Sequence, residues 1–321
     1  MAVNGVRSLA GRSIMSIADL SKLELTGLLE RSIGLKKAFK DSASGIEKQQ
    51  ALLGKSVAMI FQKRSTRTRV STETGMGLLG GRALFLGPTD IQLGVNESMK
   101  DTAKASVLSG FNSIILARVN AHKDVEELKM EASVPVINAL SDLHHPLQTL
   151  ADLMTIQERF GKLEGLTFTW VGDGNNVLHD LMLGCAKLAM NLRIATPEGY
   201  RPHPSIVSMT TDLAKGSGSS VFITADPVEA VTGAHVVATD TWVSMGQEEE
   251  AAKRIKEYAG YQVTEALMSK AEADAVFLHC LPRHKEEVDD EVFYSERSLV
   301  FPEAENRMWT VMALMLSVLG K

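Results

Sequence analysis

The chain has 321 residues, of which 45% are hydrophobic and 23% charged, and its formal net charge at pH 7 is −5. This length exceeds one ordinary hydrophobic core and predicts about two domains. The acidic balance disfavours a general nucleic-acid-binding protein, and no apolar stretch is long enough to span a bilayer. The two cysteines, Cys185 and Cys280, lack metal-ligand spacing and form no disulfide framework, so we expect a reducing compartment. Neither a nucleic-acid nor a membrane partner is expected.

Apolar runs and amphipathic segments alternate along the chain, which predicts an α/β fold with two doubly wound, mostly parallel sheets. A long helical pattern from His145 to Phe160 is expected to bridge two domains. The Met residues of a C-terminal helix over 308–319 are expected to fill a core. Strands are predicted at Ser56–Phe61, Ala83–Leu86, Ser113–Ala117, Val134–Asn138, Thr167–Val171, Leu192–Ala195, Val221–Ile223, His235–Ala238 and Ala275–Leu278. Helices are predicted at Lys22–Phe39, Val70–Leu79, Met99–Leu108, Val177–Met190 and Glu248–Tyr258.

Charged pairs mark the last of these internal helices. Glu249 and Glu250 stand four residues before Lys253 and Arg254. Such pairs stabilise an exposed helix, so the segment Gln247–Lys256 is predicted to be a solvated helix face.

Four cations and three hydroxyl side chains fill the nine residues Phe61–Arg69. The preceding run is a predicted strand and Val70 begins a predicted helix, so the hydroxyls lie at a strand-to-helix turn. Free backbone N–H groups and the helix dipole favour a phosphate there, and an Arg fork could complete the site. From these residues alone, a solvated basic loop is the alternative.

Further polar residues follow other predicted strands. Arg118 stands at a strand end, where open α/β sheets bind ligands. Asp240 begins a segment through Gly246 that fits either a mobile ligand loop or a plain connection. Cys280 fits either a buried filler or a reactive thiol. His145 fits either a ligand-binding group or a satisfied structural histidine.

A Gly-x-Gly pattern in Trp170–Val177 lies between a predicted strand and a predicted helix, which is the context of a dinucleotide-binding turn. Val177 stands where the third glycine is required, so nicotinamide binding is not expected. Asn175 and Asn176 suit a small polar ligand instead.

Together these segments resemble the aspartate/ornithine carbamoyltransferase family over nearly the whole chain. The segments Ser244–Gly246 and His279–Pro282 favour the branch of the family that uses ornithine. We find no departure from the family pattern at its site positions. The matching segments are Ser65–Arg69, Arg118, His145–Gln148, Asp173–Asn176, Asp240 with Ser244–Gly246, His279–Pro282 and Glu305–Arg307.

The resemblance implies transfer of the carbamoyl group of carbamoyl phosphate to the δ-amine of L-ornithine, giving L-citrulline and phosphate, as in arginine biosynthesis and the urea cycle. It implies a carbamoyl phosphate-binding domain over residues 1–145, on which helix 306–321 packs, and an ornithine-binding domain over 146–305. By the same resemblance, carbamoyl phosphate is bound by Ser65, Thr66, Arg67, Thr68, Arg118, His145, Gln148, Cys280, Leu281 and Arg307, with Gln92 from the neighbouring subunit.

For the acceptor, the resemblance implies that ornithine is bound by Asn176, Asp240, Ser244 and Met245. The catalytic residues would be Cys280, Asp240, Arg118 and His145. Donors around the carbonyl oxygen would stabilise the charge that develops as the amine attacks. The amine must lose a proton, which either the Asp240–Cys280 pair or the departing phosphate accepts. The family also has a cis peptide at Leu281–Pro282.

The resemblance implies no metal and no cofactor. It does imply a homotrimer, in which each subunit supplies Gln92 and Ser98 to the site of its neighbour. The segments Phe61–Ser65 and Val292–Glu305 resemble animal and fungal mitochondrial forms, which favours the mitochondrial matrix over the cytoplasm. Two alternatives stay open: a sister carbamoyltransferase that uses aspartate, putrescine or an acetylated ornithine, and a non-catalytic homologue that retains the fold.

Overall fold

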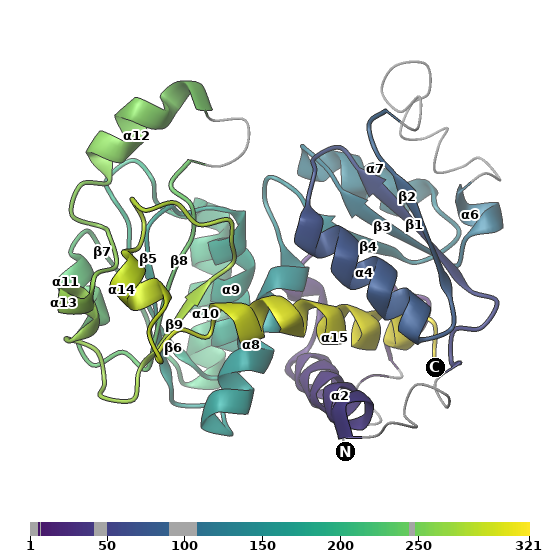
Figure 1. Ribbon diagram of the computed structural model, residues 1–321, viewed down its shortest axis with the longest axis horizontal. Coiled ribbons are helices and arrows are strands. Elements are labelled where there is room, and N and C mark those ends of the chain that lie inside the picture. The colour runs from purple at the N-terminus through teal and green to yellow at the C-terminus, as the bar shows by residue number, and fades with distance from the viewer. Residues whose placement is uncertain (1–5, 7, 42–49, 90–107, 244–247) are drawn as a thin grey trace. The chain divides into compact units, whose positions relative to one another are not determined.

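The computed structural model describes residues 6, 8–41, 50–89, 108–243 and 248–321 (Figure 1). The chain forms two compact units, Met1–Met154 with Glu305–Lys321, and Thr155–Ala304. Each unit contains one parallel sheet with helices between its strands, so the predicted α/β fold with two doubly wound sheets is confirmed. The domain boundary at residues 145 and 146 stays a prediction. Within the described ranges, no helix has the length and apolar character to cross a membrane.

The first unit is built on the strands β1 (Ser56–Phe61), β2 (Arg82–Leu86), β3 (Ile114–Arg118) and β4 (Val136–Leu140). They lie in the order β2-β1-β3-β4, and all neighbours are parallel. The chain passes from β1 outward to β2 and then returns to β3, so the sheet reverses its direction of winding between β1 and β3. Ligands of open α/β sheets bind beyond the carboxyl ends of the strands at such a point. The helices of this unit are η1 (Ile17–Asp19), α2 (Lys22–Asp41), α4 (Thr66–Leu78), α6 (Leu108–Phe111) and α7 (His122–Glu131).

The second unit is built on the strands β5 (Thr167–Val171), β6 (Asn191–Ala195), β7 (Val221–Thr224), β8 (Val236–Thr239) and β9 (Val276–His279). Their order is β7-β6-β5-β8-β9, again all parallel, and the winding reverses between β5 and β8. The carboxyl ends of these two strands are therefore the place to look for a ligand site.

Helices cover both faces of the second sheet. On one face an apolar cluster joins the sheet to α11 (Pro227–Val231), α13 (Glu265–Met268) and α14 (Asp290–Phe293). Figure 1 shows α9 (Asn176–Lys187) and α10 (Pro204–Ser217) on the other side of the sheet. The remaining elements are η2 (Glu248–Glu250) and α12 (Ala251–Glu257), together with α8 (Pro146–Phe160) and α15 (Val300–Val318), whose residues belong partly to each unit.

Most predicted elements differ from the observed ones only at their ends. The largest such difference is at the start of α15, which begins at Val300 rather than near Met308. Pro302 lies in its first turn, where a missing N–H removes no hydrogen bond, so this proline does not delay the helix. Met312 and Met315 are fully buried, which confirms their predicted core role. The predicted helix Met99–Leu108 lies outside the described residues, except for Leu108, which begins α6.

Candidate functional site

The first turn of α4 sets the position of the predicted phosphate site. Ser65 is its N-cap, and the side-chain oxygen of this residue accepts a hydrogen bond from the Thr68 backbone N–H at 3.3 Å. Because of this cap the helix begins at Thr66, ahead of the predicted start at Val70. Thr66, Arg67 and Thr68 thereby occupy the first turn, where the backbone N–H groups have no helical partner. Together with the dipole, this turn suits a bound phosphate.

One cation of this segment belongs to the helix surface instead. The Nε of Arg69 lies 3.1 Å from Glu73 Oε1, and the guanidinium lies 3.8 Å from the centre of the Phe85 ring. Its side chain is 47% exposed. Arg69 therefore stabilises the surface of α4 and β2, and it fits the solvated interpretation of the basic cluster.

A buried polar network in the first unit joins the start of α4 to α8 and α15. Arg307 donates to the Gln148 carboxamide oxygen at 2.6 Å and to the Thr68 hydroxyl at 3.1 Å. The Gln148 carboxamide nitrogen donates to Asp152 at 2.7 Å. All four side chains are at most 5% exposed. The structure thus brings together three predicted carbamoyl phosphate residues that are far apart in the sequence.

His145 and Arg118 complete this part of the site. Arg118 is the last residue of β3, beside the point where the sheet reverses its winding, and both side chains are buried. Burial lowers the pKa of His145 well below its ordinary value of 6.5, and the charges of Arg307, Arg118 and Arg67 lower it further. Its Nδ1 atom is buried and has no hydrogen-bond partner among the described residues. This histidine is neutral and does not fit a satisfied structural role.

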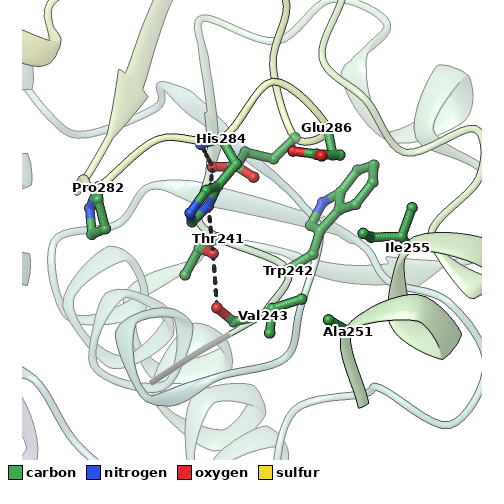
Figure 2. A pocket seen from close by; sticks show the side chains of 9 residues that line it. Thr241, Trp242, Val243, Ala251, Ile255, Pro282, His284 and Glu286 are labelled. Atoms are coloured by element: carbon green, nitrogen blue, oxygen red, sulfur yellow. Dashed lines mark hydrogen bonds and ion pairs between the residues drawn. The ribbon is translucent and has the colours of Figure 1, made fainter. Parts of the chain in front are cut away.

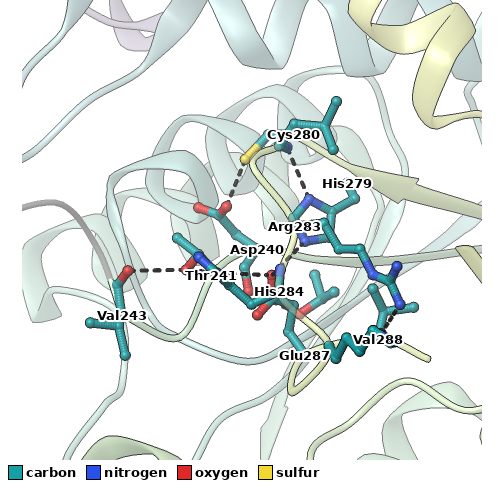
Figure 3. Close-up of polar contacts among 12 residues, drawn as sticks. Asp240, Thr241, Val243, His279, Cys280, Arg283, His284, Glu287 and Val288 are labelled. Carbon is teal, nitrogen blue, oxygen red and sulfur yellow. Dashed lines mark hydrogen bonds and ion pairs between the residues drawn. The ribbon is translucent and has the colours of Figure 1, made fainter. Parts of the chain in front are cut away.

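In the second unit, Asp240 follows β8 and Asn175 follows β5, so the two lie at the carboxyl ends of the strands that flank the winding reversal. The carboxylate of Asp240 accepts hydrogen bonds from Cys280 Sγ at 2.8 Å and from Asn175 Nδ2 at 2.8 Å. Figure 3 shows the thiol pointing at this carboxylate. Cys280 is half-buried, so it is not a buried filler. The structure brings Asp240 and Cys280 together as the resemblance implies.

Asn175 contributes a contact that the sequence did not assign. Its side-chain oxygen caps α9 by accepting from the backbone N–H groups of Val177 and Leu178, which leaves its amide nitrogen for Asp240. The predicted ligand residue Asn176 is the first residue of α9 and is half-buried. The positive end of the α9 dipole favours a carboxylate and the Asp240 carboxylate favours an amine, so this place can bind a ligand that carries both groups.

His279 and Glu287 brace the turn that carries Cys280 (Figure 3). The backbone N–H of Leu281 donates to His279 Nδ1 at 2.9 Å, and His279 Nε2 lies 3.3 Å from Glu287 Oε1. Burial raises the pKa of Glu287 to about 7. Leu281 has a positive φ of 59°, and the Leu281–Pro282 peptide is cis, as the resemblance implies.

The ligand atoms of Asp240, His279 and Cys280 all lie within 4.8 Å of one another. Among the described residues this is the one group of His, Cys, Asp and Glu side chains close enough to bind a metal ion together. Both ring nitrogens of His279 already have hydrogen-bond contacts, so a metal would have to displace Leu281 or Glu287. The cluster is therefore better suited to hydrogen bonding than to metal binding.

Arg254 and Asp173 form a buried ion pair that contacts the segment after Asp240, and this pair shows that one prediction is wrong. Arg254 on α12 is 5% exposed, so the predicted solvated face over Gln247–Lys256 is wrong at this residue. Its Nη1 donates to Asp173 at 3.2 Å and to the Trp242 carbonyl oxygen at 2.7 Å. Tyr258 also donates to Asp173, at 2.8 Å. Burial raises the pKa of Asp173, and the Arg254 charge opposes that rise.

The Gly-x-Gly pattern has a packing explanation. A Cβ atom added to Gly174 would lie 2.4 Å from the backbone of Arg201 and Pro202 and 2.5 Å from the Tyr200 carbonyl oxygen. Only glycine fits this close approach between two segments of backbone. The glycine therefore serves the local fold and does not call for a bound dinucleotide.

A cavity of about 400 Å³ lies in the second unit beside the start of the Asp240 segment (Figure 2). Thr241, Trp242, Val243 and Ile255 line it, and His284 and Glu287 contribute polar groups. Among the described residues, none of those predicted to bind a substrate or to be catalytic lines this cavity. Three predicted residues, Gln92, Ser244 and Met245, lie outside the described residues, as does Ser98.

Comparisons with known proteins agree with this geometry. Residues 12–158 match the model of the aspartate/ornithine carbamoyltransferase carbamoyl-P binding domain, and residues 164–318 match that of the Asp/Orn binding domain. The chain is 54% identical to the mitochondrial ornithine transcarbamylase of Gallus gallus, covering 97% of this chain and 86% of the relative. It is 51% identical to the mitochondrial ornithine carbamoyltransferase of Schizosaccharomyces pombe, covering 96% and 94%.

Solved structures of ornithine carbamoyltransferases are also similar to this chain over nearly its whole length. The ornithine carbamoyltransferase of Pyrococcus furiosus aligns with a TM-score of 0.92 and 46% identity, covering 97% of this chain and 98% of that one. A mitochondrial ornithine carbamoyltransferase of Coccidioides immitis aligns with a TM-score of 0.89 and 44% identity, covering 97% and 99%.

Proposed function

Because the chain belongs to the aspartate/ornithine carbamoyltransferase family, we propose that it transfers the carbamoyl group of carbamoyl phosphate to the δ-amine of L-ornithine. The products are L-citrulline and phosphate. The observation that carries this proposal is the pairing of a capped helix start with a neutral, buried His145 in one unit, and of Asp240 with Cys280 in the other.

The first unit binds carbamoyl phosphate. The phosphate lies at the first turn of α4, where Ser65, Thr66 and Arg67 offer hydroxyls, N–H groups and a cation. The carbamoyl carbonyl oxygen accepts hydrogen bonds from His145 and Arg118. A neutral imidazole suits this role because it donates one hydrogen bond without placing a full charge on the ground-state carbonyl. As the carbonyl oxygen becomes negative during attack, Arg118 stabilises it.

The second unit prepares the amine. A free aliphatic amine has a pKa of about 10.4, so most of the amine is protonated at neutral pH. The protonated form must lose a proton before its nitrogen can attack. The Asp240 carboxylate orients the amine, and Asn175 and Cys280 hold that carboxylate in place. Asn176, at the start of α9, binds the amino-acid end of ornithine.

In the chemical step, the lone pair of the δ-nitrogen forms a bond to the carbonyl carbon, and the bond from that carbon to the phosphate oxygen breaks. The electron pair of the broken bond leaves with the phosphate. The proton released by the amine is accepted by the departing phosphate or by the Asp240–Cys280 pair. Orienting two substrates in this way can supply much of the rate, since effective molarities of on the order of 10⁵ M are reached in well-aligned reactions.

A panel of acceptors tests this assignment. The purified chain is given carbamoyl phosphate with ornithine, aspartate, putrescine or N-acetylornithine, and phosphate release is measured for each. We expect turnover with ornithine to exceed turnover with the other acceptors by at least about 10³-fold. Putrescine lacks the α-carboxylate and N-acetylornithine lacks the free α-amine, whereas aspartate keeps both groups but has no δ-amine to present to the carbonyl carbon. A preference for another amine would place the chain in a sister activity, and binding of a bisubstrate phosphonate without turnover would indicate a non-catalytic homologue.

The resemblance also supports a homotrimer in which Gln92 serves the site of the neighbouring subunit. Light scattering should then give about three times the 34.8 kDa mass of one chain. Mixing inactive Arg67→Ala and Gln92→Ala chains should restore part of the activity, because some sites of a mixed trimer receive both native residues. A monomeric mass, or no recovery on mixing, would contradict this assembly.

We place the protein in the mitochondrial matrix, since several of its relatives are mitochondrial enzymes. Fractionation of cells that express the protein should recover it with soluble matrix markers. Recovery with cytosolic markers would contradict this placement.

A further inference from the structure

Asp152 is a buried carboxylate that the proposed reaction does not use. It lies on α8, one helical turn after Gln148, and it is 5% exposed. Burying a carboxylate is costly unless hydrogen-bond donors surround it. One of its donors is the Gln148 carboxamide nitrogen, at 2.7 Å from Asp152 Oδ1. A charge-assisted bond of this length is among the stronger hydrogen bonds in proteins.

This contact determines which way the Gln148 carboxamide faces. A carboxylate only accepts hydrogen bonds and a guanidinium only donates them. The nitrogen end of Gln148 must therefore face Asp152, and its oxygen end faces Arg307, which donates to it at 2.6 Å. Gln148 is 2% exposed, so solvent offers no replacement for either partner. The orientation is fixed by the chemistry of both neighbours.

A fixed carboxamide oxygen can distinguish two substrates of nearly equal shape. Carbamoyl phosphate and acetyl phosphate share the phosphate and the carbonyl group, and differ in that an NH₂ group of the first replaces a methyl group of the second. The NH₂ group donates hydrogen bonds and the methyl group does not. A carbonyl oxygen has two lone pairs, so Gln148 can accept from the substrate NH₂ while Arg307 still donates to it. If the carboxamide turned around, its own NH₂ would meet the NH₂ of the substrate.

We propose that Asp152 is a specificity-determining positioning residue, which selects a carbamoyl over an acetyl group by holding the Gln148 carboxamide oxygen toward the substrate. The proposal rests on the proposed function and on Gln148 being one of the carbamoyl phosphate-binding residues that the resemblance implies, with its contact at the carbamoyl group. Arg307 alone is a weaker constraint, because it also donates to Thr68 at the start of α4 and is available to the phosphate.

The test compares two ligands rather than one activity. Dissociation constants of carbamoyl phosphate and acetyl phosphate are measured by calorimetry for the full-length wild type, Asp152→Ala and Asp152→Asn. We expect Asp152→Ala to weaken carbamoyl phosphate binding by about tenfold or more and to change acetyl phosphate binding by less than about twofold. Asp152→Asn keeps the shape and one acceptor atom, so a smaller change in the same direction is expected, and this variant serves if Asp152→Ala does not fold. Asp212→Asn, whose carboxylate is 72% exposed beside Lys215, is the control and should match the wild type.

The Gln148→Ala background separates positioning from general structure. Adding Asp152→Ala to that background should leave the ratio of the two dissociation constants unchanged within about twofold, because the carboxamide to be positioned is gone. Equal weakening of both ligands by Asp152→Ala, or an unchanged ratio in the single variant, would overturn the proposal. Failure of the proposed function has a different signature, since the wild type would then fail to form citrulline or to bind carbamoyl phosphate at all.

Discussion

Asp240→Asn separates the use of ornithine from the binding of carbamoyl phosphate. The substitution removes one negative charge and keeps the shape of the side chain. Asn175 cannot turn its amide toward the new residue without losing the cap on α9, so the new side chain must present its oxygen to Asn175 and its NH₂ group to Cys280. The local hydrogen bonds survive in this arrangement, and we expect a loss of unfolding free energy of only about 1 kcal/mol.

The effect on ornithine should be much larger. A unit charge about 4 Å from the amine is worth about 4 kcal/mol at an effective dielectric constant of about 20. Since about 1.4 kcal/mol corresponds to a factor of ten, kcat/KM for ornithine should fall by about 10²- to 10³-fold. The dissociation constant of carbamoyl phosphate should change by less than about twofold. The phosphate turn belongs to the other unit, and Cys280, which the resemblance also assigns to carbamoyl phosphate, keeps a hydrogen bond to residue 240.

The assay combines steady-state citrulline formation with calorimetry of carbamoyl phosphate binding. Asp212→Asn removes the same charge from an exposed site and should behave as the wild type. Equal, mild effects of Asp240→Asn on both substrates would refute the division of roles between the two units.

Three further predictions concern charge and protonation. Arg67→Ala should lower kcat/KM for carbamoyl phosphate by about 10²-fold or more, because charge-assisted contacts to the phosphate are lost. Arg69→Ala, on the surface of α4, is the control and should change kcat/KM by less than about threefold. Similar losses in both variants would contradict the phosphate site. Burial and three nearby cations lower the pKa of His145, so its imidazole ¹⁵N shifts should show a neutral ring as the pH passes 6.5, and titration at that pH would contradict the account. Burial raises the pKa of Glu287 from 4.5 to about 7, so its contribution to stability is present below pH 4.5 and is lost as the pH rises toward 7. The unfolding free energy of the wild type relative to Glu287→Gln should fall over that interval by about 3 kcal/mol, and parallel pH profiles would contradict the burial effect.

The sequence predicts the phosphate turn well because its signals are local. An apolar run, a hydroxyl cap and a cluster of cations stand next to one another, and each constrains the backbone on its own. The sequence still predicts the start of α4 four residues late, at Val70, since it does not reveal which hydroxyl caps the helix. The structure assigns that role to Ser65.

The support around the site was harder to predict because its contacts join distant residues. Arg254 stands in a charge-rich run whose acidic residues precede basic ones by four positions, which is typical of a solvated helix, and its partner Asp173 is 81 residues away. No periodicity in the sequence distinguishes this buried cation from its exposed neighbours. Asp152 carried a weak local signal, since it lies four residues after Gln148 and therefore on the same helix face.

Asn175 shows a third kind of limit. Two adjacent asparagines share the same context, and only the backbone of the helix start decides that one of them caps α9 and reaches Asp240. The resemblance pointed to Asn176 as the ligand residue, and that assignment stays a prediction.

The most direct test of the central claim follows the transferred atom itself. The purified wild-type chain is incubated with [¹³C]carbamoyl phosphate and L-ornithine, and the label is followed by NMR while phosphate is counted. We predict that the ¹³C signal moves from carbamoyl phosphate to the ureido carbon of citrulline, with one phosphate released for each citrulline formed. Release of phosphate without labelled citrulline, or no turnover at all, would contradict the assignment of carbamoyl transfer to ornithine.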